Sequence, residues 1–171
     1  MKNYKWDRFY LHMYYHADIN VVFNSWATPE GQMSFFVREC ISKRNGTTVD
    51  SKSLFMVGDT YEYLWEDNGR SSGEILLVDT NKHIIVFSFA GAKIQIRLEE
   101  TPLGVLLELK HFDIPERDQK LHQLDCRVGW THFLVNLKCL LEKGVDIRED
   151  DPACGGTLGW GINPPKGVIL S

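Results

Sequence analysis

The alternation of apolar and polar positions divides the chain into one strand, two short helices, a long run of strands and a final helix. Residues 8–17, "RFYLHMYYHA", alternate between an apolar face and a more polar one, which is the period of a half-buried strand. The apolar face comprises Phe9, Leu11, Met13 and Tyr15. The chain therefore begins with a strand that covers a core on one side only.

Residues 18–37 change to a helical period and carry two sets of start signals. Asp18 is a suitable N-cap for a helix whose apolar stripe consists of Ile19, Val22, Phe23 and Trp26. Thr28 offers a second N-cap, and Pro29 follows at the first helical position, where its missing N–H costs nothing. The second stripe consists of Met33, Phe36 and Val37. Two such short helices form a poor core by themselves, so we expect both to pack on a sheet.

The middle of the chain reads as strands and turns. A weak strand at Arg38–Lys43 precedes the loop "RNGTTVD", which contains a hairpin-type Asn45-Gly46 pair. After Ser53, five more strand segments follow, separated by turn residues. They contain, in order, "TYEYLW", "EILLVD", "HIIVFSF", "KIQIRL" and "VLLELK". Each strand has one apolar and one polar face. This pattern predicts an antiparallel meander whose apolar face is covered by other elements and whose polar face is in solvent.

A helix from about Asp118 to Lys143 ends the regular structure, with Gly144 as its C-cap. Its apolar face consists of Cys126, Trp130, Phe133, Leu134, Leu137, Leu140 and Leu141. Leu121, Leu124 and Val128 point about half a turn away from that face. Either the helix bends near Gly129, or its first turns pack under a loop.

These elements predict an α+β fold. A curved antiparallel sheet of about six to seven strands wraps the long C-terminal helix, and two short helices follow the first strand. Aromatic side chains dominate the predicted interior, where they either form a plain core or line an apolar cleft with a few polar tips. The candidate lining residues are Tyr15, Trp26, Tyr61, Tyr63, Trp65, Phe87, Phe89, His111, Trp130 and Phe133.

Composition and charge narrow the classes of function. A chain of 171 residues suits one domain, and a net charge of −4 gives no electrostatic footprint for nucleic acid. No apolar stretch reaches the length of a membrane span, and the first residues do not resemble a signal peptide, so we expect a cytoplasmic protein. The cysteines Cys40, Cys126, Cys139 and Cys154 are scattered without a C-x-x-C pair, which favours reduced thiols.

Catalytic and metal motifs are not evident. Nucleotide-binding, zinc-protease and nucleophile-elbow patterns are absent from the sequence. His122 and Cys126 share a helix face at i and i+4, but further ligands at a compatible spacing are missing, so we interpret the pair as chance and predict no metal. His111 follows Leu107 and Leu109 in register and points inward. A hydrogen-bonded structural role is favoured for it over a role as general acid or base.

Several segments together resemble a known family. "WATPEG", "VGDTYEYLWEDNG", "SGEILLVD", "VFSF" and "GWTHFLVNLKCLLEKGVDIR" are similar, in order and spacing, to homologues of the activator of the heat-shock ATPase. That family belongs to the START-like, or SRPBCC, superfamily of helix-grip proteins. Trp26, Gly58, Gly129 and Trp130 match its fold signatures, and the family supplies no shared catalytic set. The resemblance implies a space between sheet and long helix that takes apolar ligands.

Three functions follow from this resemblance. The first is a non-catalytic START-like domain, residues 1–150, whose cavity binds a lipid-like or aromatic small molecule without a cofactor. The alternative is a protein-interaction domain of co-chaperone type, and an enzyme such as an aromatic cyclase is a weaker third. Residues 151–171 form a glycine- and proline-rich extension, either frayed or extended along the domain.

Overall fold

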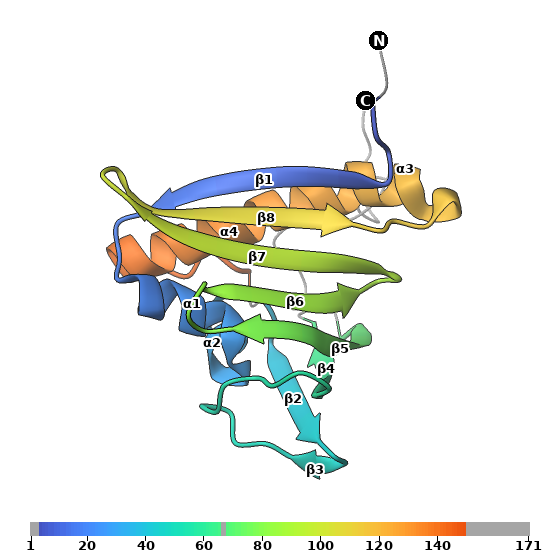
Figure 1. The fold of residues 1–171 in the computed structure, drawn as a ribbon, viewed down its shortest axis with the longest axis horizontal. Coiled ribbons are helices and arrows are strands. Elements are labelled where there is room, and N and C mark those ends of the chain that lie inside the picture. The colour runs from blue at the N-terminus through green and yellow to red at the C-terminus, as the bar shows by residue number, and fades with distance from the viewer. Residues whose placement is uncertain (1–3, 66–67, 150–171) are drawn as a thin grey trace.

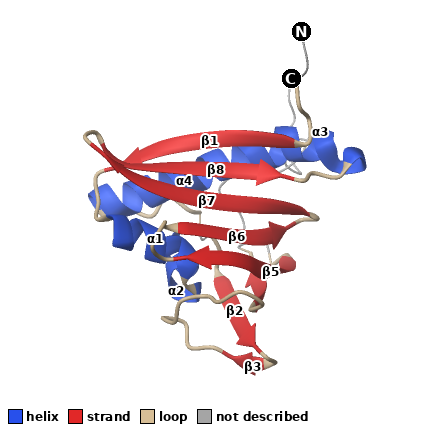
Figure 2. Cartoon of the chain, in the orientation of Figure 1, coloured by secondary structure: helices blue, strands red, loops and turns tan. Residues whose placement is uncertain are grey.

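The computed structural model describes residues 4–65 and 68–149 and confirms the predicted fold class. A curved antiparallel sheet crosses the long helix α4 (Arg127–Lys143), and the two short helices lie near one end of α4, below β7 (Figure 1). The predicted extension, residues 151–171, lies outside the described residues. Figure 2 shows the helices gathered on one side of the sheet.

The sheet of the described part of the chain has eight strands in the order β1-β8-β7-β6-β5-β4-β2-β3. The extra strand, relative to the six or seven predicted, is a two-residue partner of β2. It forms because Asn45 and Gly46 both adopt positive φ angles, of 51° and 81°, and close a tight hairpin. The strands are β1 (Arg8–Tyr15), β2 (Glu39–Arg44), β3 (Thr47–Thr48), β4 (Thr60–Leu64), β5 (Arg70–Asp79), β6 (Ile84–Phe89), β7 (Ala92–Thr101) and β8 (Gly104–Phe112).

Helices α1 (Ile19–Ala27) and α2 (Pro29–Phe35) are separated by Thr28 alone. The Thr28 hydroxyl donates to the Asn24 carbonyl of α1 and accepts from the Gly31 amide of α2, both at 2.9 Å. One side chain therefore ends the first helix and caps the second. The abrupt change of direction lets both helices reach the core, where Trp26 is fully buried.

The C-terminal helix runs without a break, but the number of residues per turn changes along its first part. A 3-10 turn (η1, Glu116–Asp118) and a short α-helical turn (α3, Gln119–Leu121) lead into a π-helical turn (η2, His122–Cys126), which precedes α4. The wider π turn changes the helical phase, which explains why the apolar stripe breaks. The irregularity thus lies before Gly129. Leu121, Leu124 and Val128 are 56%, 66% and 55% exposed, so packing under a loop is wrong.

Side chains of the C-terminal helix also bond the free edge of strand β1. The Gln123 amide donates to the carbonyls of Trp6 and Arg8, both at 3.0 Å, and Lys138 Nζ donates to the Tyr14 carbonyl at 2.6 Å. Exposed edge groups invite pairing with other chains unless they are covered. The helix therefore covers both ends of this edge while its apolar face packs on the sheet.

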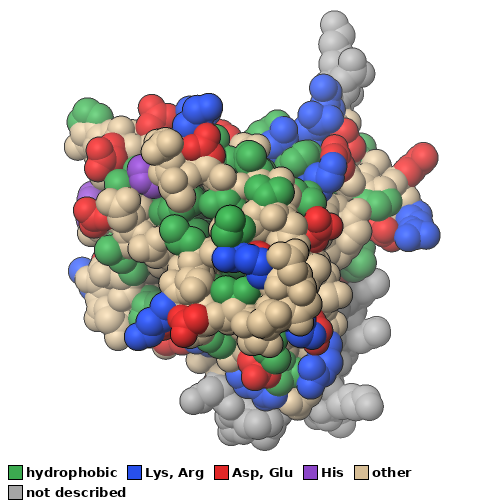
Figure 3. Space-filling model, turned by 60° about the horizontal axis from the view of Figure 1, so that its bottom comes forward, with side chains coloured by type: hydrophobic (Ala, Val, Ile, Leu, Met, Phe, Trp, Pro, Cys, Tyr) green, Lys and Arg blue, Asp and Glu red, His purple; other side chains and the backbone are tan. Residues whose placement is uncertain are grey.

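The surface carries charges of both signs. On the face in Figure 3, hydrophobic side chains lie in small groups among acidic and basic ones. Within residues 4–65 and 68–149, no helix is long and apolar enough to span a bilayer. Cys40, Cys126 and Cys139 are free thiols, as predicted, and Cys154 lies outside the described residues.

Gly73→Ala should destabilise the fold by about 1–3 kcal/mol, the usual cost of overpacking a core. A Cβ at this position would overlap the Tyr61 hydroxyl and the Ser88 carbonyl, which are hydrogen-bonded to each other. Urea unfolding measures the change. Ser72→Ala, one residue away at an exposed position, is the control, and an equal loss in both variants would contradict this explanation.

Candidate functional site: an aromatic interior

The structure brings the ten candidate residues to the inner side of the sheet or to the helices that face it. Trp65 and Phe89 are partly buried and pack against the core. The other candidates are at most 9% exposed, and comprise Tyr15, Trp26, Tyr61, Tyr63, Phe87, His111, Trp130 and Phe133. The period-2 pattern of the strands and the helical stripes that contain Trp26, Trp130 and Phe133 therefore predicted the inward positions correctly.

Strand β4 and Trp65, the residue that follows it, contribute a stack of rings. The rings of Tyr61 and Tyr63 lie 4.1 Å apart at 28°, and Trp65 meets Tyr63 edge-on at 5.9 Å. Their polar tips are bonded to the protein. The Tyr61 hydroxyl donates to the Ser88 carbonyl, and the Tyr63 hydroxyl donates to Gln32 Oε1 at 2.7 Å. Burial raises the pKa of both hydroxyls, so both stay neutral.

Phe36, which was not among the candidates, occupies the centre of this aromatic interior. Its ring stacks on Trp130 at 5.0 Å and 24°, and receives the Phe133 ring edge-on at 4.8 Å. The sequence pattern placed Phe36 on a helix stripe, whereas α2 ends one residue earlier and turns the side chain inward. The run "FFV" at the helix end was the available signal. Its ring neighbours are Trp26, Phe35, Tyr63, Trp65, Phe89, Trp130 and Phe133.

Most polar atoms of the interior are matched, but one indole is not. Gln32 is fully buried, and its amide donates to the Trp26 carbonyl at 3.0 Å. Trp65 Nε1 donates to Ser71 Oγ at 3.0 Å. Among the described residues, four buried side-chain atoms have no hydrogen-bond partner, namely Trp26 Nε1, Ser42 Oγ, Arg127 Nε and His132 Nε2. An unmatched N–H in a fully buried side chain is rare and calls for an explanation.

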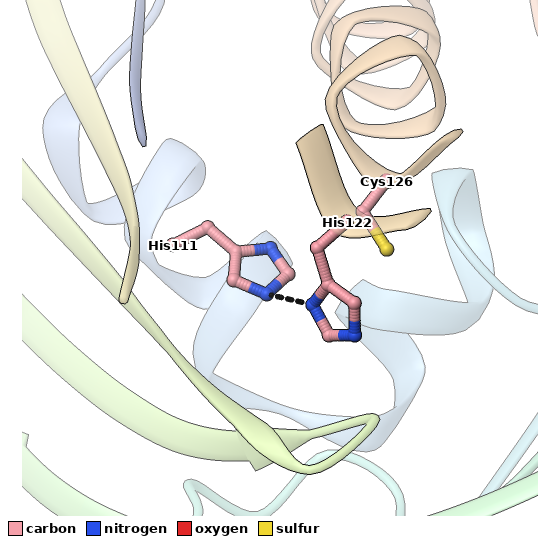
Figure 4. Close-up of side chains that lie close together, drawn as sticks. All are labelled: His111, His122 and Cys126. Carbon is pink, nitrogen blue, oxygen red and sulfur yellow. Dashed lines mark hydrogen bonds between the residues drawn. The ribbon is translucent and has the colours of Figure 1, made fainter. Parts of the chain in front are cut away.

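A histidine pair lies at the other end of the interior (Figure 4). Trp130 Nε1 donates to His111 Nδ1 at 3.0 Å, and His111 Nε2 lies 2.9 Å from His122 Nδ1. Because an indole N–H only donates, the proton of a neutral His111 is on Nε2 and points to His122. His122 then carries its proton on Nε2 and donates to the Ala90 carbonyl. The Trp130 N–H therefore fixes the tautomers of both histidine rings.

Both histidines are neutral at physiological pH. Burial, with a smaller contribution from His122, lowers the pKa of His111 to about 3, and burial also lowers the pKa of His122. A general acid or base needs a pKa near the working pH. The nitrogens of His111 are also both engaged in hydrogen bonds. The arrangement therefore supports the structural role predicted for His111.

The same pair forms a potential metal-ligand group with Cys126. The ligand atoms of His111, His122 and Cys126 lie within 4.8 Å of one another, a convergence that the sequence analysis missed because β8 and η2 meet only in the fold. A metal on His111 Nε2 would require a proton on Nδ1, which faces the Trp130 N–H. Burial also raises the pKa of the Cys126 thiol to about 11. The donor set therefore fits a hydrogen-bonded cluster better than a cation site.

The architecture defines the class of protein. A curved antiparallel sheet that wraps a long C-terminal helix, with two short helices after the first strand, is the helix-grip fold of START-like proteins. The model of the family "Activator of Hsp90 ATPase homolog 1-like protein" matches residues 16–142. The chain belongs to this family, as the sequence motifs indicated. No curated protein matches the chain.

Solved structures with the same fold have low sequence identity to this chain. A protein from Staphylococcus saprophyticus has a TM-score of 0.66 at 23% identity, covering 82% of this chain and 95% of its own. One from Nitrosomonas europaea has a TM-score of 0.64 at 16% identity, with 81% and 96% covered. The Aha1 dimer from Colwellia psychrerythraea has a TM-score of 0.63 at 17% identity, with 80% and 97% covered. At these identities the likeness concerns the fold alone.

The histidine pair should make the protein sensitive to acid. The folded pKa of His111, about 3, lies below the unfolded value near 6.5, so its stabilising contribution is full above pH 6.5 and is lost as pH falls toward 3. Each proton gained on unfolding contributes a slope of about 1.4 kcal/mol per pH unit. Urea unfolding between pH 7 and 4 should show a shallower slope for His111→Gln than for the wild type. The exposed, non-titrating variant Ser72→Ala should leave the slope unchanged, and an unchanged slope in His111→Gln would contradict the assignment.

Proposed function

We propose that this chain is a non-catalytic START-like domain that binds an aromatic or lipid-like small molecule between the sheet and α4. The observation that carries the proposal is the unmatched N–H of Trp26, a side chain with 0% exposure. A ligand that carries a hydrogen-bond acceptor would complete this donor. Burial of such a donor without a partner otherwise costs about 1–3 kcal/mol.

The surrounding chemistry supports a largely apolar ligand. Rings from α2 and α4 lie beside Trp26, with centroid distances of 4.9 Å to Phe35 and 6.1 Å to Trp130. Sites for small molecules are mostly apolar and contain a few polar groups that orient the ligand. The proposed lining is the predicted set of Tyr15, Trp26, Tyr61, Tyr63, Trp65, Phe87, Phe89, His111, Trp130 and Phe133.

Two bicyclic probes of nearly equal size test this proposal. Quinoline carries a ring nitrogen that accepts a hydrogen bond, whereas naphthalene does not. Wild-type protein should bind quinoline more tightly, and Trp26→Phe should lower quinoline affinity by about three- to tenfold without affecting naphthalene, since one hydrogen bond contributes about 1 kcal/mol. Isothermal titration calorimetry measures both affinities.

The control for this experiment is Trp6→Phe, which removes an indole that is 49% exposed. It should bind both probes like the wild type. If neither probe binds the wild type, and native mass spectrometry finds no co-purifying small molecule, the ligand-binding proposal is wrong. Equal affinity of wild type and Trp26→Phe for quinoline would contradict the role of the Trp26 donor.

A second candidate function is interaction with a partner protein of the Hsp90 type. The family description names an activator of the Hsp90 ATPase, and one structural neighbour is an Aha1 dimer. The specific observation in this chain is the apolar group formed by Leu121, Leu124 and Val128, which is more than half exposed at the start of the C-terminal helix. Exposed apolar patches often mark protein contacts.

Leu124→Ser should weaken such an interaction about tenfold if Leu124 lies at the centre of the contact, where truncations have large effects. The measurement is stimulation of a purified Hsp90 ATPase by the wild-type chain and by each variant. Leu103→Ser is a matched control, because Leu103 and Leu124 are both 66% exposed, and Leu103 lies in the turn between β7 and β8, away from the start of the C-terminal helix. Absence of stimulation by the wild-type chain would leave this candidate without support.

A further inference from the structure

We propose that the Phe36 ring occupies the position of the ligand's ring and must leave before an aromatic ligand can bind. The inference rests on the proposed ligand-binding function and narrows its ligand to a planar aromatic molecule. Phe36 lies between the helices and the sheet, in contact with rings from α1, α4, β4 and β6. It is the ring around which the proposed lining residues converge.

The contacts of Phe36 describe a slot for a flat ring. Trp130 lies parallel to it, at 24°, whereas Tyr63, Trp65 and Phe133 present their rings at 83°, 88° and 88°. One stacked and three edge-on neighbours satisfy the preferences of an aromatic ring from several sides. A flexible alkyl chain would fill the volume but lose these oriented contacts. The slot therefore favours an aromatic ligand over a fatty-acid chain.

The position of Phe36 in the chain allows an exchange of side chains without unfolding an element. It follows the last residue of α2, and the connection to β2 is three residues long, 36–38. The backbone amides of Phe36 and Val37 both donate to the Gln32 carbonyl, at 2.9 and 3.2 Å. These bonds hold the backbone while the side chain rotates. Of its ring neighbours, Trp65 and Phe89 are only partly buried, so the exit lies past these two rings.

The indole ring of Trp26, which carries the unmatched donor, lies next to this slot. The ring centroids of Trp26 and Phe36 are 6.3 Å apart, so a bicyclic ligand in place of Phe36 extends beside the indole. Phenylalanine has no acceptor and leaves the indole N–H unpaired. The exchange therefore replaces an apolar occupant with one that can also satisfy Trp26.

The first test follows the Phe36 ring directly. 4-Fluorophenylalanine is incorporated at position 36 in one sample and at position 55, another buried phenylalanine, in a second, and fluorine NMR spectra are recorded with increasing quinoline. We expect a large shift of the resonance at position 36 on saturation and a small one at position 55. If quinoline binds but the resonance at position 36 does not move, the inference is overturned, while the proposed function stands.

The second test removes the ring. Phe36→Ala should bind naphthalene and quinoline about tenfold or more tightly than the wild type, because binding no longer requires the ring to leave. Phe55→Ala is the control, because Phe55 is also a buried ring, at 2% exposure, and among the described residues no ring contact joins it to Phe36 or Trp26. It should bind like the wild type.

The outcomes separate the two proposals. Binding by Phe36→Ala but not by wild type supports the position of the slot and overturns ligand binding by the native chain. Equal affinity in wild type, Phe36→Ala and Phe55→Ala overturns the slot alone, and no binding by any of them overturns both. Decanoate binding Phe36→Ala as tightly as naphthalene would overturn the aromatic preference. Phe36→Leu replaces Phe36→Ala if the latter does not fold, with the same expected direction.

Discussion

Trp130 of the long helix holds the helix against the sheet through two contacts. Trp130 offers its ring face to Phe36 and its N–H to His111, so the same indole fills the apolar layer and orients the polar pair. An indole suits this role because it buries a large apolar area yet carries one directional donor. Loss of the ring would open the layer, and loss of the N–H alone would release the tautomers of both histidines.

The sequence predicted the elements whose rules are local. The alternation along β1, β4 and β8 identified which side chains face the core, and the Thr28-Pro29 pair identified the second helix start. These features depend on neighbours a few residues away, for which periodicity and capping are reliable guides. The fold class followed because the same pattern recurred along most of the chain.

The features that escaped prediction depend on residues far apart in the sequence or on small changes of phase. His111 and His122 meet because the end of β8 faces the π turn, and no spacing rule relates a strand residue to a residue in a π turn. Phe36 became central because α2 ends at Phe35, and an element boundary is where periodic patterns are least exact. The unmatched Trp26 N–H is visible only once all nearby acceptors are placed.

The π turn η2 acts as a one-residue insertion that the helix has absorbed without breaking. Each extra residue rotates the turns before it by about 100° relative to the turns after it. Here that rotation lets Gln123 reach the edge of β1 and His122 reach His111, while Trp130 and Leu137 still face the sheet. A related chain that lacked this residue would have a more regular helix but different contacts at its start. The number of residues in this helix, compared between relatives, would therefore indicate whether they share the contacts of Gln123 and His122.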